Sequence, residues 1–210
     1  MKPLKELFPS ASALNVACFL TQASVVSGIV ALVFFLNDDL VLGGLFAFIS
    51  IVFDMVDGPV ARRFNLSSEF GRVFDLLNDM FSSVIVPALV CMHLGSYRWF
   101  WILGGTVYIL LGHMRLTHYN TAEQRPGYFC GVPTASAYPL VVVPLCSFIY
   151  FFDISMDGPI GWLYPVYIIL VSVAMVVRIP YKRQGLFNIL LILATACILG
   201  LGILKSRGLF

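Results

Sequence analysis

Apolar residues occur in long, nearly uninterrupted runs that are separated by short polar segments. A helix needs about 20 apolar residues to cross the hydrocarbon core of a bilayer. Seven runs approach or exceed this length, at about 12–36, 40–61, 71–94, 98–118, 133–152, 159–178 and 185–204. Strands are not expected, because the runs lack two-residue alternation and an open sheet edge cannot be satisfied in lipid. The pattern therefore predicts an all-α integral membrane protein.

The composition agrees with extensive lipid contact. Of the 210 residues, 60% are hydrophobic and 11% are charged, whereas soluble domains carry roughly 25% charged residues. The net charge of +2 and the lack of a basic run argue against a nucleic-acid partner. No repeat, low-complexity segment or long linker divides the chain, so we expect residues 1–210 to form a single membrane domain.

Basic residues cluster on one side of the predicted membrane. If the N-terminus is cytoplasmic, ten of the 13 Lys and Arg residues lie in cytoplasmic segments, and only Arg98, Lys205 and Arg207 lie outside. Cytoplasmic loops of membrane proteins are rich in Lys and Arg, so we expect a cytoplasmic N-terminus. The outer loops hold four acids that we expect to be plain solvated residues: Asp38, Asp39, Asp153 and Asp157.

Four aspartates lie near the facing ends of the second and third predicted helices: Asp54, Asp57, Asp75 and Asp79. Acidic side chains in membrane spans are costly and are candidates for function by default. On the second helix, steps of three and four residues place one set on a common face: Asp54, Asp57, Gly58, Ala61 and Arg62. On the third helix, a four-residue repeat forms a stripe: Gly71, Asp75 and Asp79.

The connection between these two helices, residues 63–70, is short. We therefore expect the helices to be antiparallel neighbours whose acidic faces meet. Ser67 or Ser68 is placed to cap the third helix.

Four facing carboxylates would repel one another unless cations lay between them. Hard oxygen ligands suit Mg²⁺ or Mn²⁺, and two such ions about 3.5–4 Å apart can neutralise a pyrophosphate and support in-line displacement at phosphorus. Three small residues leave room for a nucleotide beside the acids: Gly58, Ala61 and Gly71. The competing interpretation is that the acids form structural salt bridges with three nearby arginines: Arg62, Arg63 and Arg72.

The same segment resembles the signature of the CDP-alcohol phosphotransferase family, D-x-x-D-G-x-x-A-R-x(8)-G-x-x-x-D-x-x-x-D. All eight fixed positions are present over 26 residues: Asp54, Asp57, Gly58, Ala61, Arg62, Gly71, Asp75 and Asp79. The resemblance implies a core of six transmembrane helices, here about 12–182, that is usually dimeric and has a two-metal site open to the cytoplasm. Residues 185–204 would then form an extra, seventh helix.

The resemblance also implies roles for these residues. The four aspartates would hold two divalent cations, Mg²⁺ or Mn²⁺, and Asp79 would in addition act as general base on the acceptor hydroxyl. Four positions would lie against the CDP group: Gly58, Ala61, Arg62 and Gly71. Pro59 directly follows Gly58 and removes one helix hydrogen bond, which we expect the helix to tolerate.

Residues 114–137 are similar to a stretch of bacterial and archaeal phosphatidylserine synthases. The matching positions are Arg115, Leu116, Tyr119, Asn120, Phe129, Gly131, Pro133 and Ala135. Residues 178–182 resemble a second element of that subfamily, and Thr21, Ser24 and Gly28 resemble its first helix. The resemblance implies CDP-diacylglycerol as donor, L-serine as acceptor and CMP as leaving group, in the cytoplasmic membrane of a prokaryote.

A serine acceptor carries a carboxylate that an arginine can bind. The candidate acceptor-binding residues are Arg72, Arg115, Asn120, Arg125 and Thr134. The arginines could instead anchor helix ends at the cytoplasmic face, and His118 and Thr134 depart from the subfamily pattern. The same chemistry on inositol phosphate or glycerol 3-phosphate is therefore the main alternative, and a small transporter or ion channel that uses intramembrane acids is a remote one.

Overall fold

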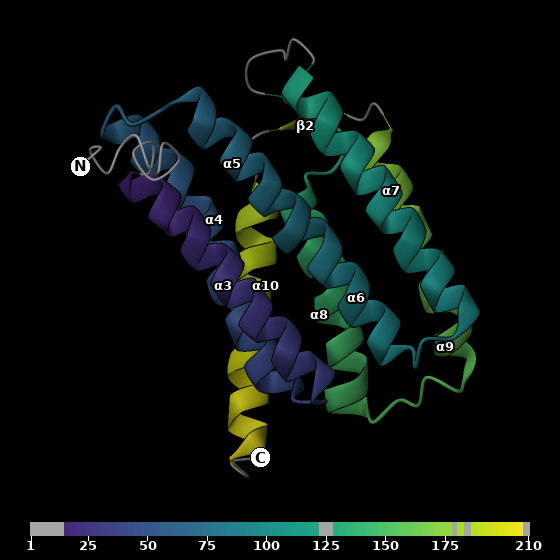
Figure 1. Cartoon of the computed structure of the whole chain (residues 1–210). Coiled ribbons are helices and arrows are strands. Elements are labelled where there is room, and N and C mark those ends of the chain that lie inside the picture. The colour runs from purple at the N-terminus through teal and green to yellow at the C-terminus, as the bar shows by residue number, and fades with distance from the viewer. Residues whose placement is uncertain (1–14, 122–127, 178–179, 183–185, 208–210) are drawn as a thin grey trace, which may run out of the picture.

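The structure is a computed structural model that describes residues 15–121, 128–177, 180–182 and 186–207 (Figure 1). Its helices are α3 (Val16–Leu36), α4 (Leu40–Arg63), α5 (Glu69–Asp79), α6 (Val86–Leu94), α7 (Trp99–Thr121), α8 (Thr134–Phe152), α9 (Pro159–Val176) and α10 (Leu186–Ser206). A π-helical segment, η1 (Met80–Ile85), joins α5 to α6. Two short strands, β1 (Tyr128–Cys130) and β2 (Pro180–Lys182), complete the described part of the chain.

The helices coincide with the apolar runs of the sequence, so the predicted all-α class is confirmed. The third run corresponds to α5, η1 and α6, which form one continuous rod over Glu69–Leu94. Among the described residues, four helical segments have the length and composition of membrane spans: Val16–Leu36, Leu40–Arg63, Glu69–Leu94 and Pro159–Val176. The chain is thus an integral membrane protein, and spans in the other three runs stay a prediction.

No strand lies in an apolar run within the described residues, as expected, but two short strands occur in the connections between the runs. β1 and β2 pair antiparallel, with Phe129 opposite Tyr181, and join the segment after α7 to the segment after α9. Gly131 then passes close to the end of α9: its φ is +77°, and a Cβ there would overlap the backbone carbonyl of Met175. The ribbon lies in polar connections outside the long apolar helices, where strand edges can be hydrated.

The most extensive helix pair is α3 with α4. Ser24 Oγ donates to the Ser50 carbonyl at 3.0 Å, and Ser50 Oγ donates to the Ser24 carbonyl at 2.9 Å. Gly28 lies beside this pair, 3.5 Å from Ser50 Oγ at the position that its Cβ would occupy. Small and hydroxyl residues allow such close approach and satisfy polar groups across helices in a membrane. The contact fixes the height of α4, and hence of its acids, relative to α3.

The buried core lies between α6, α7, α8 and α9. Trp101 and Tyr108 of α7, Leu145 of α8 and Met175 of α9 are fully buried, and the Trp101 ring stacks on Tyr164 with centroids 5.8 Å apart. In Figure 1, the rod formed by α5, η1 and α6 runs between α3 and α7. One end of this rod therefore belongs to the core, and the other end carries the acids.

Prolines inside the helices free backbone carbonyls, and tyrosines bind two of them. A proline at position i cannot donate to the carbonyl of residue i−4. In this register the Ser83 carbonyl receives no hydrogen bond from Pro87, and the Leu140 carbonyl receives none from Pro144. Tyr108 Oη donates to the Ser83 carbonyl at 3.1 Å, and Tyr167 Oη donates to the Leu140 carbonyl at 3.0 Å. Helix α4 continues through Pro59 to Arg63, as expected.

The acids at the opposite end of the molecule are exposed, but the prediction that they are plain loop residues is wrong for three of the four. Asp39 caps α4 by accepting a hydrogen bond from the Leu42 N–H at 2.9 Å. Asp38 lies 3.3 Å from His93 Nε2 at the end of α6.

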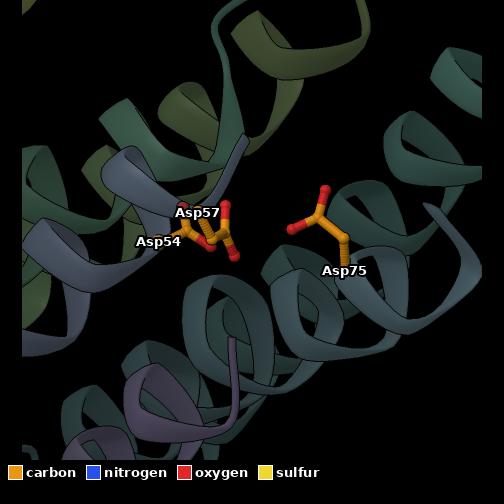
Figure 2. A group of neighbouring side chains, drawn as sticks. All are labelled: Asp54, Asp57 and Asp75. Atoms are coloured by element: carbon orange, nitrogen blue, oxygen red, sulfur yellow. The ribbon is translucent and has the colours of Figure 1, made fainter. Parts of the chain in front are cut away.

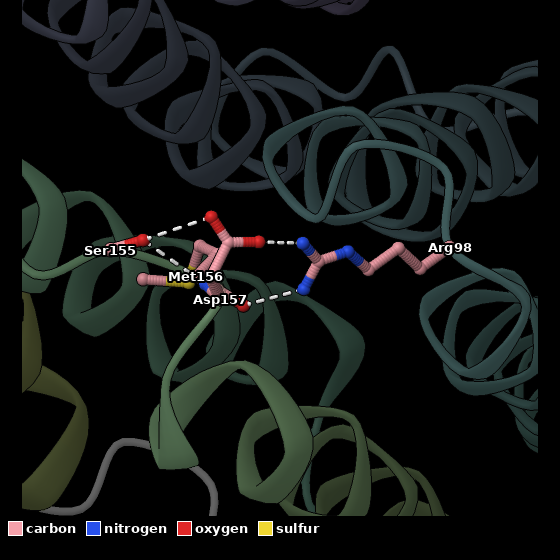
Figure 3. A network of polar contacts seen from close by, with 4 residues as sticks. All are labelled: Arg98, Ser155, Met156 and Asp157. Atoms are coloured by element: carbon pink, nitrogen blue, oxygen red, sulfur yellow. Dashed lines mark hydrogen bonds and ion pairs between the residues drawn. The ribbon is translucent and has the colours of Figure 1, made fainter.

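The third such acid is Asp157, which pairs with Arg98 (Figure 3). Arg98 also donates to the Met156 carbonyl at 2.9 Å. This arginine therefore ties the start of α7 to the loop before α9. The connections at this end are short, so their charged side chains have partners within reach.

Helix α10 packs against α4 and α8. Leu199 fits over Gly44, where an added Cβ would lie 2.6 Å from Leu199 Cδ2. Near the end of α10, Lys205 Nζ donates to the Tyr150 carbonyl of α8 at 2.7 Å. Helix α10 is thus attached to the rest of the bundle at two levels.

Candidate active site

The acids of α4 and α5 meet across a gap between the two helices (Figure 2). Asp54 and Asp57 project from the last turns of α4, and Asp75 faces them from α5. One carboxylate oxygen from each of the three lies within 4.8 Å of the others. Two segments with different helix axes thus supply a compact set of hard oxygen ligands.

Local hydrogen bonds position the two helices. Ser68 caps α5 by accepting from the Gly71 N–H at 3.0 Å, which confirms the capping prediction. Asn15 caps α3, and its Nδ2 donates to the Leu66 carbonyl at 3.1 Å in the loop between α4 and α5. The start of α3 therefore holds the loop that brings the acids together.

Two buried neutral side chains orient the carboxylates, and sequence reasoning did not assign either one to the site. Thr21 Oγ1 of α3 donates to Asp57 Oδ2 at 2.7 Å, and Asn78 Nδ2 of α5 donates to Asp54 Oδ1 at 3.1 Å. Thr21 had appeared only as part of a subfamily resemblance in the first helix. Asn78 carries no motif signal, and its position next to Asp79 is the one clue in the sequence.

Asp79 is not one of these three clustered acids, but it touches one of them. It is half-buried at the end of α5, one turn beyond Asp75. Its carboxyl group is within hydrogen-bonding reach of Asp54, and the guanidinium of Arg115 is its nearby positive charge. Two carboxyl groups this close need a proton or a cation between them. Asp79 therefore extends the cluster of acids toward α7.

A cleft of about 540 Å³ opens beside the acids, between α3, α4 and α5. It is lined by the four positions predicted to face CDP: Gly58, Ala61, Arg62 and Gly71. A Cβ at Gly58 would come closest to the Arg62 guanidinium, at 3.4 Å, and one at Gly71 would meet Ser68 Oγ at 3.2 Å. The nearest neighbour in both cases is a side-chain end, and no backbone atom of another described segment is among the nearest atoms within 4 Å.

The three clustered acids make no direct ion pair with a basic side chain that the structure describes. Among the residues that the structure describes, no Lys or Arg nitrogen lies within 4.0 Å of the Asp54, Asp57 or Asp75 carboxylates. The alternative of structural salt bridges to the nearby arginines is therefore not what the structure contains. A compact set of carboxylates without direct ion pairs fits a hard divalent cation.

The candidate acceptor residues lie in different places. Arg72 lines the cleft and donates through Nη1 to Asn120 Oδ1 at 2.7 Å, which joins α5 to α7. Arg115 is buried in α7, with its guanidinium 5.6 Å from the centre of the Tyr119 ring. Thr134 is buried at the first turn of α8. Arg125 lies outside the described residues.

Of these candidates, Arg72 alone is among the described residues that line the cleft. Asn120 and Arg115 belong to α7 and Thr134 to α8, and none of these three is among the residues that line the cleft.

Comparison with known proteins places this geometry in a family. The model of the family described as CDP-alcohol phosphatidyltransferase matches residues 14–199. A CDP-diacylglycerol–serine O-phosphatidyltransferase of Helicobacter pylori is 30% identical over 171 residues, 78% of this chain and 70% of the relative.

Two further relatives are more distant in sequence. A CDP-diacylglycerol–serine O-phosphatidyltransferase of Bacillus subtilis is 26% identical over 64% of this chain and 76% of the relative. An archaetidylserine synthase of Methanothermobacter thermautotrophicus is 27% identical over 78% of this chain and 68% of the relative. All three relatives carry serine in their names, either as the acceptor or as part of the lipid product.

Proposed function

This chain belongs to the CDP-alcohol phosphatidyltransferase family, and we propose that it transfers the phosphatidyl group of CDP-diacylglycerol to L-serine and releases CMP. The observation that carries the reaction is the cluster of aspartates at the edge of the cleft. The serine acceptor rests on the relatives, which are named for that activity.

In this proposal, Asp54, Asp57, Asp75 and Asp79 hold two divalent cations, Mg²⁺ or Mn²⁺. When bound, such cations neutralise the pyrophosphate of the donor and support displacement at phosphorus. The cleft has the volume of ordinary ligand sites, which span roughly 300–1,000 Å³. The CDP group lies there against the glycines and Ala61, with Arg62 beside its phosphates.

Asp79 takes the proton of the serine hydroxyl in the proposed reaction. The serine oxygen forms a bond to the phosphorus that carries diacylglycerol, the phosphoanhydride bond breaks, and CMP leaves with the bonding electrons. Arg115 lies near Asp79, where it can bind the serine carboxylate. Arg72, Asn120, Arg125 and Thr134 complete the proposed acceptor group.

The wider architecture follows the family resemblance. We propose a six-helix catalytic core over about 12–182, a seventh helix over about 185–204, and a homodimer. The N-terminus and the site face the cytoplasm of a prokaryote, because ten of the 13 basic residues then lie inside.

The second candidate acceptor is inositol phosphate or glycerol 3-phosphate. Arg62 and Arg72 both line the cleft, and a phosphorylated acceptor would use such basic side chains. Membership of a transferase family leaves no observation that favours the transporter alternative.

The deciding experiment offers purified protein CDP-diacylglycerol with Mn²⁺ and a panel of acceptors, and measures CMP release. We expect L-serine to give the fastest release, and the Asp75→Asn variant to give none above background. If CMP release is faster with inositol phosphate or glycerol 3-phosphate, that compound and not serine is the acceptor.

A further inference from the structure

The rod that carries Asp75 and Asp79 contains a widened turn directly after Asp79. Across η1, the Val86 N–H donates to the Phe81 carbonyl, five residues back instead of four. One extra residue in a turn rotates the preceding helix by about 100° relative to the following one. The direction in which α5 presents its acids, relative to the buried helix α6, therefore depends on this turn.

Tyr108 of α7 holds the widened turn from outside the rod. Its ring is fully buried, and its hydroxyl donates to the Ser83 carbonyl at 3.1 Å. In the ordinary i−4 register of a helix, this carbonyl would accept from residue 87, which is a proline and has no N–H. Without Tyr108, the carbonyl would lack that donor inside the bundle, where an unpaired polar group is costly.

The widened turn is connected to the acids by two short contacts. Ser82, the residue before Ser83, donates through Oγ to the Asn78 carbonyl at 2.8 Å. The Asn78 side chain in turn donates to Asp54 Oδ1 at 3.1 Å, across to α4. Both Ser82 and Asn78 are buried, so neither contact is exchanged freely with water.

We propose that Tyr108 is a positioning residue for the metal site, acting through the widened turn on Asn78, Asp54 and Asp79. The proposal rests on the proposed two-metal site, and it adds a residue of α7 that lies outside the family signature. Tyr108 holds the turn open, the turn sets the rotation of α5, and that rotation places the carboxylates at a common centre.

The test compares two tyrosines that make the same kind of bond. Tyr108→Phe removes the hydroxyl that serves the Ser83 carbonyl. Tyr167→Phe removes the hydroxyl that donates to the Leu140 carbonyl. Pro144 leaves this carbonyl without a helix donor in the same way, but the carbonyl belongs to α8, away from the acids. For wild type and both variants, direct Mn²⁺ affinity is measured by electron paramagnetic resonance, alongside Tm and the KM for serine.

We expect Tyr108→Phe to weaken Mn²⁺ binding about three- to tenfold, the worth of one buried hydrogen bond, with little change in the KM for serine. Tyr167→Phe should lower Tm to a similar extent and leave Mn²⁺ affinity at the wild-type value. Equal Mn²⁺ affinity in the two variants would overturn the proposal.

Pro87→Ala provides the same test if Tyr108→Phe does not fold. It restores an N–H that favours a regular α-turn, so Mn²⁺ affinity should fall while Tm does not. Unchanged Mn²⁺ affinity in a folded Pro87→Ala protein would overturn the proposal as well. Because metal binding is measured without turnover, a wrong acceptor assignment would not affect either outcome.

Discussion

Gly58 of the candidate site lines the cleft, and a Cβ there would meet only the flexible end of Arg62, at 3.4 Å, whereas several glycines elsewhere are pressed against neighbours. A Cβ at Gly112, for example, would lie 2.9 Å from Val84 Cγ1. A larger side chain at Gly58 would therefore extend into the cleft. This difference makes Gly58 suitable for a steric test.

We predict that Gly58→Leu lowers affinity for a CDP ligand at least tenfold while the protein still folds. The leucine side chain would extend into the cleft and overlap the nucleotide. Gly200→Leu is the matched control, because a Cβ at Gly200 in α10 has nothing within 4 Å. Calorimetric titration with CDP, together with Tm, gives the comparison. Equal CDP affinity in both variants would mean that the nucleotide does not use this cleft.

A second prediction at the residue scale concerns Asp79, the proposed general base. Asp79→Asn keeps the size of the side chain but cannot take the serine proton, so turnover should fall about 10²–10⁴-fold. Donor affinity should fall much less, because the three clustered aspartates remain. Turnover and CDP-diacylglycerol affinity are measured on the same preparation. Turnover within a few-fold of wild type would remove Asp79 from the role of base, and a parallel loss of donor affinity would make it a metal ligand only.

The sequence predicts Asp54, Asp57 and Asp75 as neighbours because helical spacing decides which side chains share a face and the short connection 63–70 makes the two helices antiparallel neighbours. Thr21 and Asn78 are different. The contact of Thr21 with Asp57 depends on how α3 packs on α4, and that of Asn78 depends on the rotation of α5. Neither packing height nor rotation is encoded in local spacing, so these two partners become visible in three dimensions only.

At the scale of elements, the β1–β2 ribbon joins the two segments that resemble phosphatidylserine synthases. Its pairing brings the connection after α7 against the connection after α9. The ribbon then leads through Gly131 into α8, where Thr134 is buried at the first turn. The ribbon is therefore placed to set the position of one candidate acceptor residue.

We predict that Gly131→Ala raises the KM for serine several-fold and leaves CDP affinity near the wild-type value. The positive φ and the overlap with the Met175 carbonyl impose strain of about 1–3 kcal/mol, which displacement of the ribbon relieves. Gly158→Ala is the control, because its φ is −84° and its Cβ would meet the Ser155 carbonyl at an ordinary 3.6 Å. Steady-state kinetics measure the KM for serine in both variants. An unchanged KM in Gly131→Ala would mean that the ribbon does not affect acceptor binding.

The helices were predictable as elements because each one needs a long apolar run. The widened turn η1 and the β1–β2 ribbon could not be predicted from the sequence. An apolar run from 71 to 94 looks the same whether or not one turn contains an extra residue, and Pro87 is the only local sign of an irregularity. Strands of three residues are too short to show alternation, and their pairing depends on two loops that are distant in sequence.

At the scale of the whole molecule, the acids connect α3, α4, α5 and, through Asp79, α7. A cation at this junction would bind the folded bundle and not separated helices. Binding to the folded state alone stabilises it by about 2.7 kcal/mol when the free ligand is at 100 times its Kd. Metal binding and the stability of the bundle should therefore be linked.

We predict that excess EDTA abolishes CMP release and lowers Tm, and that Mn²⁺ restores both. Asp57→Asn, which removes one carboxylate of the cluster, should lose most of the Mn²⁺-dependent rise in Tm. Differential scanning fluorimetry in detergent follows the stability, and a CMP assay follows the activity. Full turnover in excess EDTA would rule out metal-assisted transfer by this protein.

The tyrosine bonds to proline-freed carbonyls have a consequence for how this sequence can change over evolutionary time. Losing Tyr108 while keeping Pro87 leaves a carbonyl without that donor in an apolar interior, whereas losing both allows an ordinary helical bond to form. The same holds for Tyr167 and Pro144. Substitutions at these positions should therefore be accepted as pairs, and a lineage that has replaced one proline should be free to replace its tyrosine by phenylalanine.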